Sequence, residues 1–151
     1  MDSERSNLVA LVHETAEHGP QAAAWRLAGN LRGYFYLRRY ASDQLVMATD
    51  ALRAAKGHPG PQAAAHLNLA AAHSAQGDNE PALAHNTAAL ALAEQAGWLQ
   101  GQAAALNNLG TVYSYTGRAG SWASWGRLPR CTAGRSPCTD RPASHSVTRP
   151  R

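Results

Sequence analysis

The sequence predicts an all-α fold in which antiparallel helix pairs repeat along the chain. The first observation is an internal repeat: QAAAHLNLAAAHSAQGD, which begins at Gln62, returns as QAAALNNLGTVYSYTGR at Gln102, an offset of 40 residues. The second is the recurrence of apolar residues at spacings of three and four, which is typical of helices with one buried face. The third is a composition rich in alanine and leucine, with one Phe and few Val and Ile, which disfavours a large β-sheet.

The two copies of the repeat agree at eight positions without a gap. A third, weaker copy starts at Gln21, where the chain reads QAAAWRLAGNL. A period of this length is typical of arrays in which each unit buries its apolar face against its neighbours. The matching pairs are Gln62/Gln102, Ala63/Ala103, Ala64/Ala104, Ala65/Ala105, Asn68/Asn108, Leu69/Leu109, Ser74/Ser114 and Gly77/Gly117.

The first three helices are expected at about 4–18, 21–38 and 42–56. Gly19 and Pro20 end the first of them, and the stretch KGHPGP after the third is expected to be a loop. The first helix is amphipathic, and its apolar face is expected to hold Leu8, Leu11, Val12 and Thr15.

The next three helices are expected at about 62–76, 79–96 and 99–116. Gly77 ends the fourth helix in a left-handed turn, and Asp78 or Asn79 caps the fifth. Small residues let neighbouring helices approach closely; those expected to do so are Ala70, Ala82, Ala89 and Gly110. The buried face of the fifth helix is expected to hold Ala82, Leu83, Asn86, Ala89, Leu90 and Ala93.

Charge divides the chain into a helical repeat domain, 1–118, and a basic tail, 119–151. The domain holds eight Lys or Arg and nine Asp or Glu, for a net charge of −1, whereas the tail holds six Arg and one Asp, for +5. The tail is rich in Arg, Ser, Pro and Gly without any period, so it is predicted to be disordered. Because both cysteines, Cys131 and Cys138, lie there, the domain has no disulfide framework.

The repeat pattern calls for another helix after Arg118, where the tail begins instead. Read out of frame with GC-rich codons, residues 120–141 can give ELGELGEAAAVHRRALALHR, which is close to PALAHNTAALALA at 81–93. We therefore hypothesise a frameshift near codons 118–120; the alternative is a naturally disordered basic tail. In either case the sixth helix would lack its partner, and the array would be marginally stable or self-associate through this uncapped helix. The face left uncovered is expected to hold Leu106, Leu109, Val112 and Tyr113.

Several of these positions resemble the tetratricopeptide repeat (TPR). Leu109 and Gly110 match its Leu-Gly pair, Tyr113 its aromatic position and Gly117 its turn glycine, whereas Ala70 and His73 depart from the pattern. Ala82 and Ala89 match the two alanines of its second helix. The 40-residue period is similar to the long-repeat class of kinesin light chains and of actinobacterial regulators of the SARP and NB-ARC types. The resemblance covers about 4–118.

The resemblance implies a TPR-like α-solenoid that serves as a protein–protein interaction scaffold, here a fragment of a larger regulatory protein. Two alternatives stay open: a non-functional remnant of a transcriptional regulator, truncated at both ends, and a regulator segment that acts with a separate DNA-binding domain. Genomic sequence on either side of the coding region would distinguish these alternatives.

The family's concave groove, lined by the first helix of each pair, is the expected binding site for a protein or peptide ligand. Asn68 and Asn108 share a repeat position, and in long-repeat relatives an asparagine there contacts the peptide backbone, to which an amide offers both donor and acceptor. The alternative is that both bond to a neighbouring helix's backbone. No Lys or Arg lies beside them in the second and third units, so a clamp for acidic C-termini is not expected. The other expected groove residues are Asn107, Thr111, Ser114 and Tyr115.

No catalytic constellation is found, so neither enzyme activity nor a cofactor is expected. Nucleophile elbows, phosphate loops and dinucleotide turns are absent from the sequence. His13 and His18 are five residues apart, about 140° around a helix, which does not suit a shared metal.

A second set of histidines is formed by His66, His73 and a facing His85. Three imidazoles can bind zinc, but His73 is better explained as filling the family's aromatic position. In the tail, Cys131, Cys138 and His145 have spacings too long for a typical zinc site. No metal is therefore expected.

One stretch interleaves basic and aromatic residues, a pattern that can bind nucleic acid. Because the domain is slightly acidic, packing of the aromatics between helices is the favoured interpretation, and direct nucleic-acid binding is not expected. No apolar run approaches the about 20 residues that span a bilayer, and the N-terminus lacks a secretory signal, so a cytoplasmic protein is expected. The interleaved residues are Arg26, Arg32, Arg38, Arg39, Trp25, Tyr34, Tyr36 and Tyr40.

Overall fold

The structure, a computed structural model, describes residues 2–117, with side chains from Glu4 onward. The chain divides into a compact unit, Met1–Gly120, and a second unit, Ser121–Arg151. The expected disordered tail, the frameshift position and the cysteines Cys131 and Cys138 lie outside the described residues.

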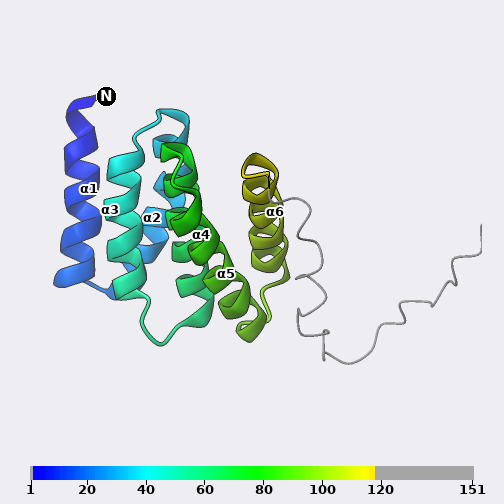
Figure 1. Cartoon of the computed structure of the whole chain (residues 1–151). Helices are drawn as coiled ribbons and strands as arrows, with labels where there is room; N and C mark the ends of the chain where they lie inside the picture. Colours follow the sequence, from blue (N-terminus) through cyan, green and yellow to red (C-terminus); the bar gives the residue numbers. More distant parts are fainter. Residues whose placement is uncertain (1, 118–151) are drawn as a thin grey trace, which may run out of the picture. The chain divides into compact units, whose positions relative to one another are not determined.

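Within residues 2–117 the structure has six helices and no strand, which confirms the all-α prediction (Figure 1). The helix α4 begins at Pro59, inside the segment expected to be a loop, because proline has no N–H to lose in a first turn and its φ already suits a helix. The helices are α1 (Asp2–Glu17), α2 (Gln21–Leu37), α3 (Ala41–Ala54), α4 (Pro59–Gln76), α5 (Asn79–Gln95) and α6 (Leu99–Tyr115).

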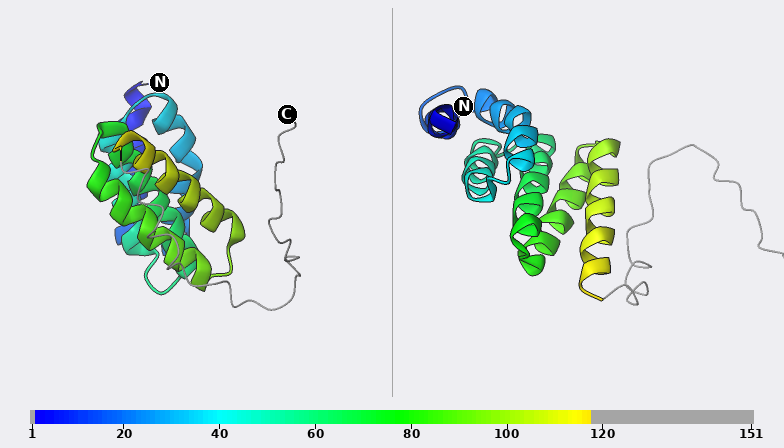
Figure 2. Two further views of the ribbon diagram at one scale, coloured as in Figure 1. Left: turned by 45° about the vertical axis from the view of Figure 1, so that its right-hand side comes forward. Right: turned by 90° about the horizontal axis from the view of Figure 1, so that it is seen from above.

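Helices that are adjacent in sequence pack against each other, as the prediction of repeated helix pairs requires. In addition α2 contacts α4 and α4 contacts α6, so alternate helices form one row, while α1 contacts α3 on the other side of the array. Figure 2 shows the succession from α1 and α2 at one end to α5 and α6 at the other. No helix in the described part of the chain combines the length and apolarity needed to cross a membrane.

Large apolar side chains fill the core among α1, α2 and α3. Phe35, Met47 and Val12 are the largest of the fully buried apolar side chains, and Leu8, Val9 and Trp25 pack around them. The expectation that Leu11 belongs to this face is wrong, because it is 47% exposed. A helix turns by about 100° per residue, so the face centred on Val12 continues through Leu8 and Val9 and leaves Leu11 to one side.

Alanine and leucine fill the core between α4, α5 and α6. The predicted buried face of α5 is confirmed at all six positions, and three of the predicted close-approach residues, Ala70, Ala82 and Ala89, are fully buried. Gly110 is the exception. It is exposed, and no described atom lies within 4 Å of a Cβ built on it, so no close helix approach among residues 2–117 depends on it.

The turn after α4 follows the expected glycine ending, but not the expected cap. Gly77 adopts φ = 84°, and its N–H and that of the next residue bond back to α4. Asp78 occupies the N-cap position of α5, yet its side chain makes no capping hydrogen bond. Its carboxylate instead lies 3.6 Å from Nδ1 of His73.

The apolar face expected to be uncovered on α6 is mostly covered. Leu109 and Val112 are 5% and 3% exposed, and Leu106 and Tyr113 are half-buried. The large apolar residues that α6 does expose are Leu99 and Tyr115, at its two ends. The described residues therefore place little apolar surface in the middle of α6.

Candidate functional site

The row formed by α2, α4 and α6 lines an open hollow of about 760 Å³, which also reaches the start of α3. We call it the α2–α4–α6 hollow. Its walls combine apolar and aromatic surface with cationic, amide and hydroxyl groups, and they contain no acidic side chain. The polar and aromatic residues of the walls are Arg32, Tyr36, Arg39, Gln44, Ser74, Asn108, Thr111, Tyr115 and Phe35.

Three of the six residues expected in a peptide groove line this hollow: Asn108, Thr111 and Tyr115. The other three, Asn68, Asn107 and Ser114, are not part of its walls. Asn68 is 6% exposed, and both Asn107 and Ser114 are exposed. Asn68 and Asn108 share a repeat position but differ in surroundings. Asn68 lies on α4, which is packed between α2 and α6, whereas Asn108 lies on α6, which contacts α4 as its one neighbour in this row among the described helices.

Asn108 is held by a second asparagine. Its Nδ2 donates to Oδ1 of Asn86 at 3.2 Å, and Nδ2 of Asn86 donates to the carbonyl oxygen of Ala82 at 2.9 Å. The partner of Asn108 is therefore a side chain of α5, not the helix backbone considered from the sequence. Because an amide has two N–H donors and an acceptor oxygen, Asn108 keeps one donor and Oδ1 for a ligand.

Hydroxyl groups on α6 bond to their own helix. Thr111 donates to the carbonyl oxygen of Asn107 at 2.9 Å, and Ser114 donates to that of Gly110 at 2.8 Å. Such bonds to the residue four positions earlier use the hydroxyl proton. Thr111 therefore offers the hollow an acceptor oxygen rather than a donor.

Two cations, Arg32 and Arg39, also line the α2–α4–α6 hollow. From the sequence, no Lys or Arg was expected beside the asparagines in the second and third units, and none of the hollow's lining residues from those units is basic. The arginines come from the first unit, and the packing of α2 on α4 brings them to the hollow that Asn108 also lines. The basic residues that line the hollow thus come from outside the two units that the sequence argument considered.

Gln44, near the start of α3, is a site residue that the sequence did not single out. It is 3% exposed, lines the hollow, and its Nε2 has no hydrogen-bond partner. A buried amide donor without a partner costs about 1–3 kcal/mol. A ligand acceptor that reached Gln44 would recover part of that cost.

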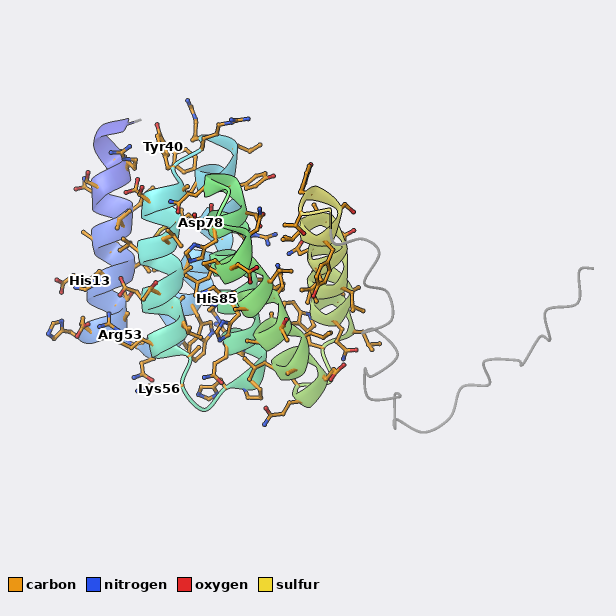
Figure 3. The ribbon with its side chains drawn as sticks, in the orientation of Figure 1. His13, Tyr40, Arg53, Lys56, Asp78 and His85 are labelled. Carbon is orange, nitrogen blue, oxygen red and sulfur yellow. The ribbon has the colours of Figure 1, made fainter. Side chains whose placement is uncertain are left out.

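The histidines singled out from the sequence meet between α4 and α5. Nδ1 of His66 lies 3.0 Å from Nδ1 of His85, so one ring donates and the other accepts. His73 stacks on His85 with ring centroids 5.5 Å apart (Figure 3 labels His85 and Asp78). Within residues 4–117 no three His, Cys, Asp or Glu side chains are placed to hold a metal ion together.

Burial favours the neutral form of two of these rings. It lowers the pKa of His66 below its ordinary value of 6.5. Burial also lowers the pKa of His85, and positive charge on His66 and His73 lowers it further. The hydrogen bond between His66 and His85 therefore favours a neutral imidazole as its acceptor.

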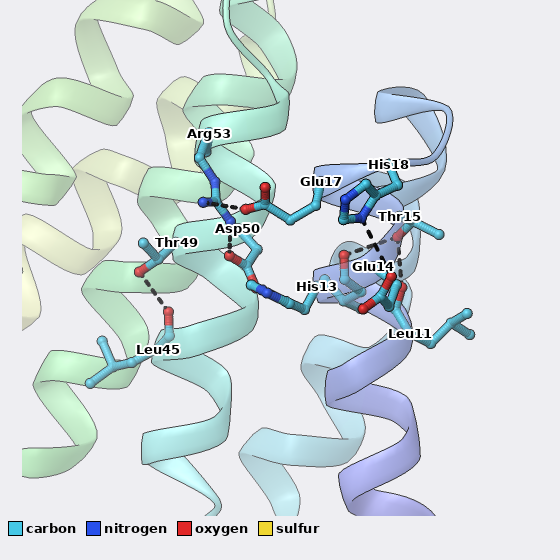
Figure 4. Close-up of polar contacts among 11 residues, drawn as sticks. Leu11, His13, Glu14, Thr15, Glu17, His18, Leu45, Thr49, Asp50 and Arg53 are labelled. Carbon is cyan, nitrogen blue, oxygen red and sulfur yellow. Dashed lines mark hydrogen bonds and ion pairs between the residues drawn. The ribbon is translucent and has the colours of Figure 1, made fainter.

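His13 joins a polar network between α1 and α3 (Figure 4). Its Nδ1 lies 3.0 Å from Oδ2 of Asp50, a residue that is only 5% exposed. Arg53 contacts both Asp50 and Glu17. Ion pairing of a buried carboxylate explains this network without a metal.

The aromatic residues of the basic–aromatic stretch pack inside the domain. Trp25 lies against His58 with ring centroids 5.2 Å apart, and Tyr34 and Phe35 both contact the ring of Tyr40. Arg5 of α1 lies over the Tyr40 ring at 4.7 Å. Tyr36 is the exception, being 58% exposed. Most of these rings are therefore used between helices.

Comparison with known proteins gives no match at any of three levels. No protein-family model matches the chain, no curated protein matches it, and no solved structure matches it.

Proposed function

We propose that this domain is a protein–protein interaction scaffold of the TPR type, whose α2–α4–α6 hollow holds a peptide segment of another protein. The observation that carries the proposal is the placement of Asn108, fixed by Asn86 at the wall of a hollow lined by alternate helices. Repeat arrays present one row of helices to their partners in this way.

The arrangement of helices supports the TPR type. The 40-residue period corresponds to the helix pair α4–α5 followed by α6, and glycines end α4 and α6 at equivalent positions, Gly77 and Gly117. The sequence resemblance to SARP and NB-ARC regulators supports the further proposal that the domain derives from a cytoplasmic regulatory protein. Its partner would then be another protein component of that regulator's system.

The chemistry of the walls suits an extended peptide. Asn108 offers a donor and an acceptor to a peptide unit. Tyr36 and Tyr115 are exposed rings on α2 and α6 that line the same hollow and offer large, rigid contact surfaces. A peptide lying along the hollow would therefore meet polar groups for its backbone and aromatic surface for its side chains.

Selection of peptides from a displayed random library on the immobilised full chain tests the proposal. Asn108→Ala is expected to weaken a selected peptide by roughly 3- to 10-fold, the loss expected for one or two hydrogen bonds. Asn30→Ala, on an exposed position of α2 outside the hollow, is the control and should leave binding unchanged. Equal weakening by both variants, or no effect of Asn108→Ala, would place the peptide elsewhere.

A further inference from the structure

The turn between α2 and α3 differs from the later turns in its backbone. Arg39, with φ = 58°, is the one non-glycine residue with positive φ in the described part of the chain. Glycine takes this conformation at positions 57, 77, 97 and 117. A residue with a Cβ is strained in the left-handed region, whereas glycine is not. The chain therefore keeps an arginine where the backbone favours glycine.

The strained arginine and a second one, Arg32, line the α2–α4–α6 hollow. Both are exposed, and no carboxylate of residues 4–117 forms an ion pair with either. By contrast, Arg5 and Arg53 are both ion-paired. The hollow is thus lined by two arginines and by no acidic residue that would balance their charge.

The amide groups add donors to the same hollow. Gln44 presents a buried Nε2 without a hydrogen-bond partner, and Asn108 retains a donor beyond its bond to Asn86. Guanidinium and amide N–H groups together suit carboxylates and peptide carbonyl oxygens, and a guanidinium can bind a carboxylate through two hydrogen bonds at once.

We infer that Arg39 is a binding residue held in a strained turn, and that the α2–α4–α6 hollow takes an acidic peptide segment. Asp or Glu side chains of the peptide pair with Arg32 and Arg39, while a backbone oxygen accepts from Asn108. The inference rests on the proposed function and adds the chemical class of the partner.

Charge distinguishes this occupant from two others. Residues 119–151 carry a net charge of +5, so this chain's own C-terminal segment does not complement the two arginines. A nucleic acid would meet a domain whose net charge over residues 1–118 is −1. Binding to phosphate backbones gains from many cations over a wide surface, whereas a short acidic peptide needs only the local pair.

The variant Arg39→Gly separates a binding role from a structural one. Relief of the strained φ is expected to leave the melting temperature of the full chain unchanged or to raise it. The same variant is expected to weaken an acidic peptide about tenfold or more, the effect of losing a charge-assisted hydrogen bond. Arg38→Gln is the control, because Arg38 is exposed, has φ = −85° and does not line the hollow.

Parallel selections from a random displayed library, on the full chain and on its Arg32→Gln/Arg39→Gly variant, identify the partner's chemistry. Enrichment of Asp and Glu on the wild type, lost on the variant, is the expected result. Enriched peptides with equal acidic content on both proteins would overturn the inference and leave the proposed function standing. No enrichment on the wild type would contradict both, and tighter binding of oligo(dT) than of the selected peptide would replace the acidic peptide with nucleic acid.

Discussion

The first three helices and the last three are held together by different means. Among α1, α2 and α3 the core consists of large side chains such as Phe35 and Met47, and ion pairs join α1 to α3. Among α4, α5 and α6 the core consists of alanine and leucine without a buried aromatic ring, and the polar contacts between helices join uncharged groups, as in Asn86 with Asn108. The first half is therefore built around an aromatic ring and a methionine with ion pairs between its helices, whereas the second packs alanine and leucine with uncharged polar contacts.

The difference also divides the α2–α4–α6 hollow. The first half contributes the charged groups, Arg32 and Arg39, and the second contributes Asn108 and Thr111. A polar ligand in the hollow therefore depends on both halves. The two halves should respond differently to substitution, and the following variants test that difference.

The largest effect is expected in the first half. Phe35→Ala removes a fully buried ring from the core and should lower the free energy of unfolding by about 3–5 kcal/mol, measured by urea denaturation. The control is Leu37→Ala, two residues away on the same helix and 82% exposed, which should change it by less than about 0.5 kcal/mol. Similar effects of the two variants would contradict a core centred on Phe35.

The opposite change tests the second half. Ala89→Leu adds volume at a fully buried position of α5 and should destabilise the fold by about 1–3 kcal/mol through overpacking. Ala91→Leu, on an exposed position of the same helix, should be nearly neutral in the same urea titration. If the buried variant were as stable as wild type, close helix approach would not be what holds α4 to α6.

A smaller effect is expected from pH, again in the second half. His66 and His85 have lowered pKa values in the folded chain, so the unfolded chain binds more protons at mildly acidic pH. Stability from this pair is therefore fully present above 6.5, the ordinary pKa, and is lost as the pH falls through the lowered values.

Unfolding by urea at a series of pH values measures this loss. The double variant His66→Gln/His85→Gln should flatten the acid side of the profile, while His18→Gln, which replaces an exposed ring in the turn after α1, should leave it unchanged. An unchanged slope in the double variant would show that other groups cause the acid sensitivity.

The sequence predicted the second half of the fold better than the site. The α5 face was correct because every buried position follows one helical period, which separates the buried Ala82 and Ala89 from the exposed Ala84 and Ala91. Leu11 was placed on the buried face because it lies three residues after Leu8. A leucine at the edge of that face satisfies this spacing just as a buried residue does, so spacing alone does not exclude it. Asn108 was identified because the repeat places an asparagine, Asn68, at the same position of the preceding unit.

The missing site residues came from contacts between units. Arg39, Gln44 and Asn86 are distant in sequence from Asn108 and reach the site through the packing of the helices, so no spacing rule connects them with it. Arg39 could have been found from one local signal: RRY stands at 38–40, where a glycine would be expected after the helix that ends at Leu37.

The central claim, that the α2–α4–α6 hollow is the binding surface, is tested most directly by NMR. Amide spectra of the ¹⁵N-labelled full chain are recorded during titration with a library-selected peptide. The account predicts that the largest shifts occur at Gly33, Arg39, Ser74, Asn108 and Thr111, which line the hollow on three helices and a turn. Shifts confined to α1 and the exposed positions of α5, with these five signals unmoved, would contradict it.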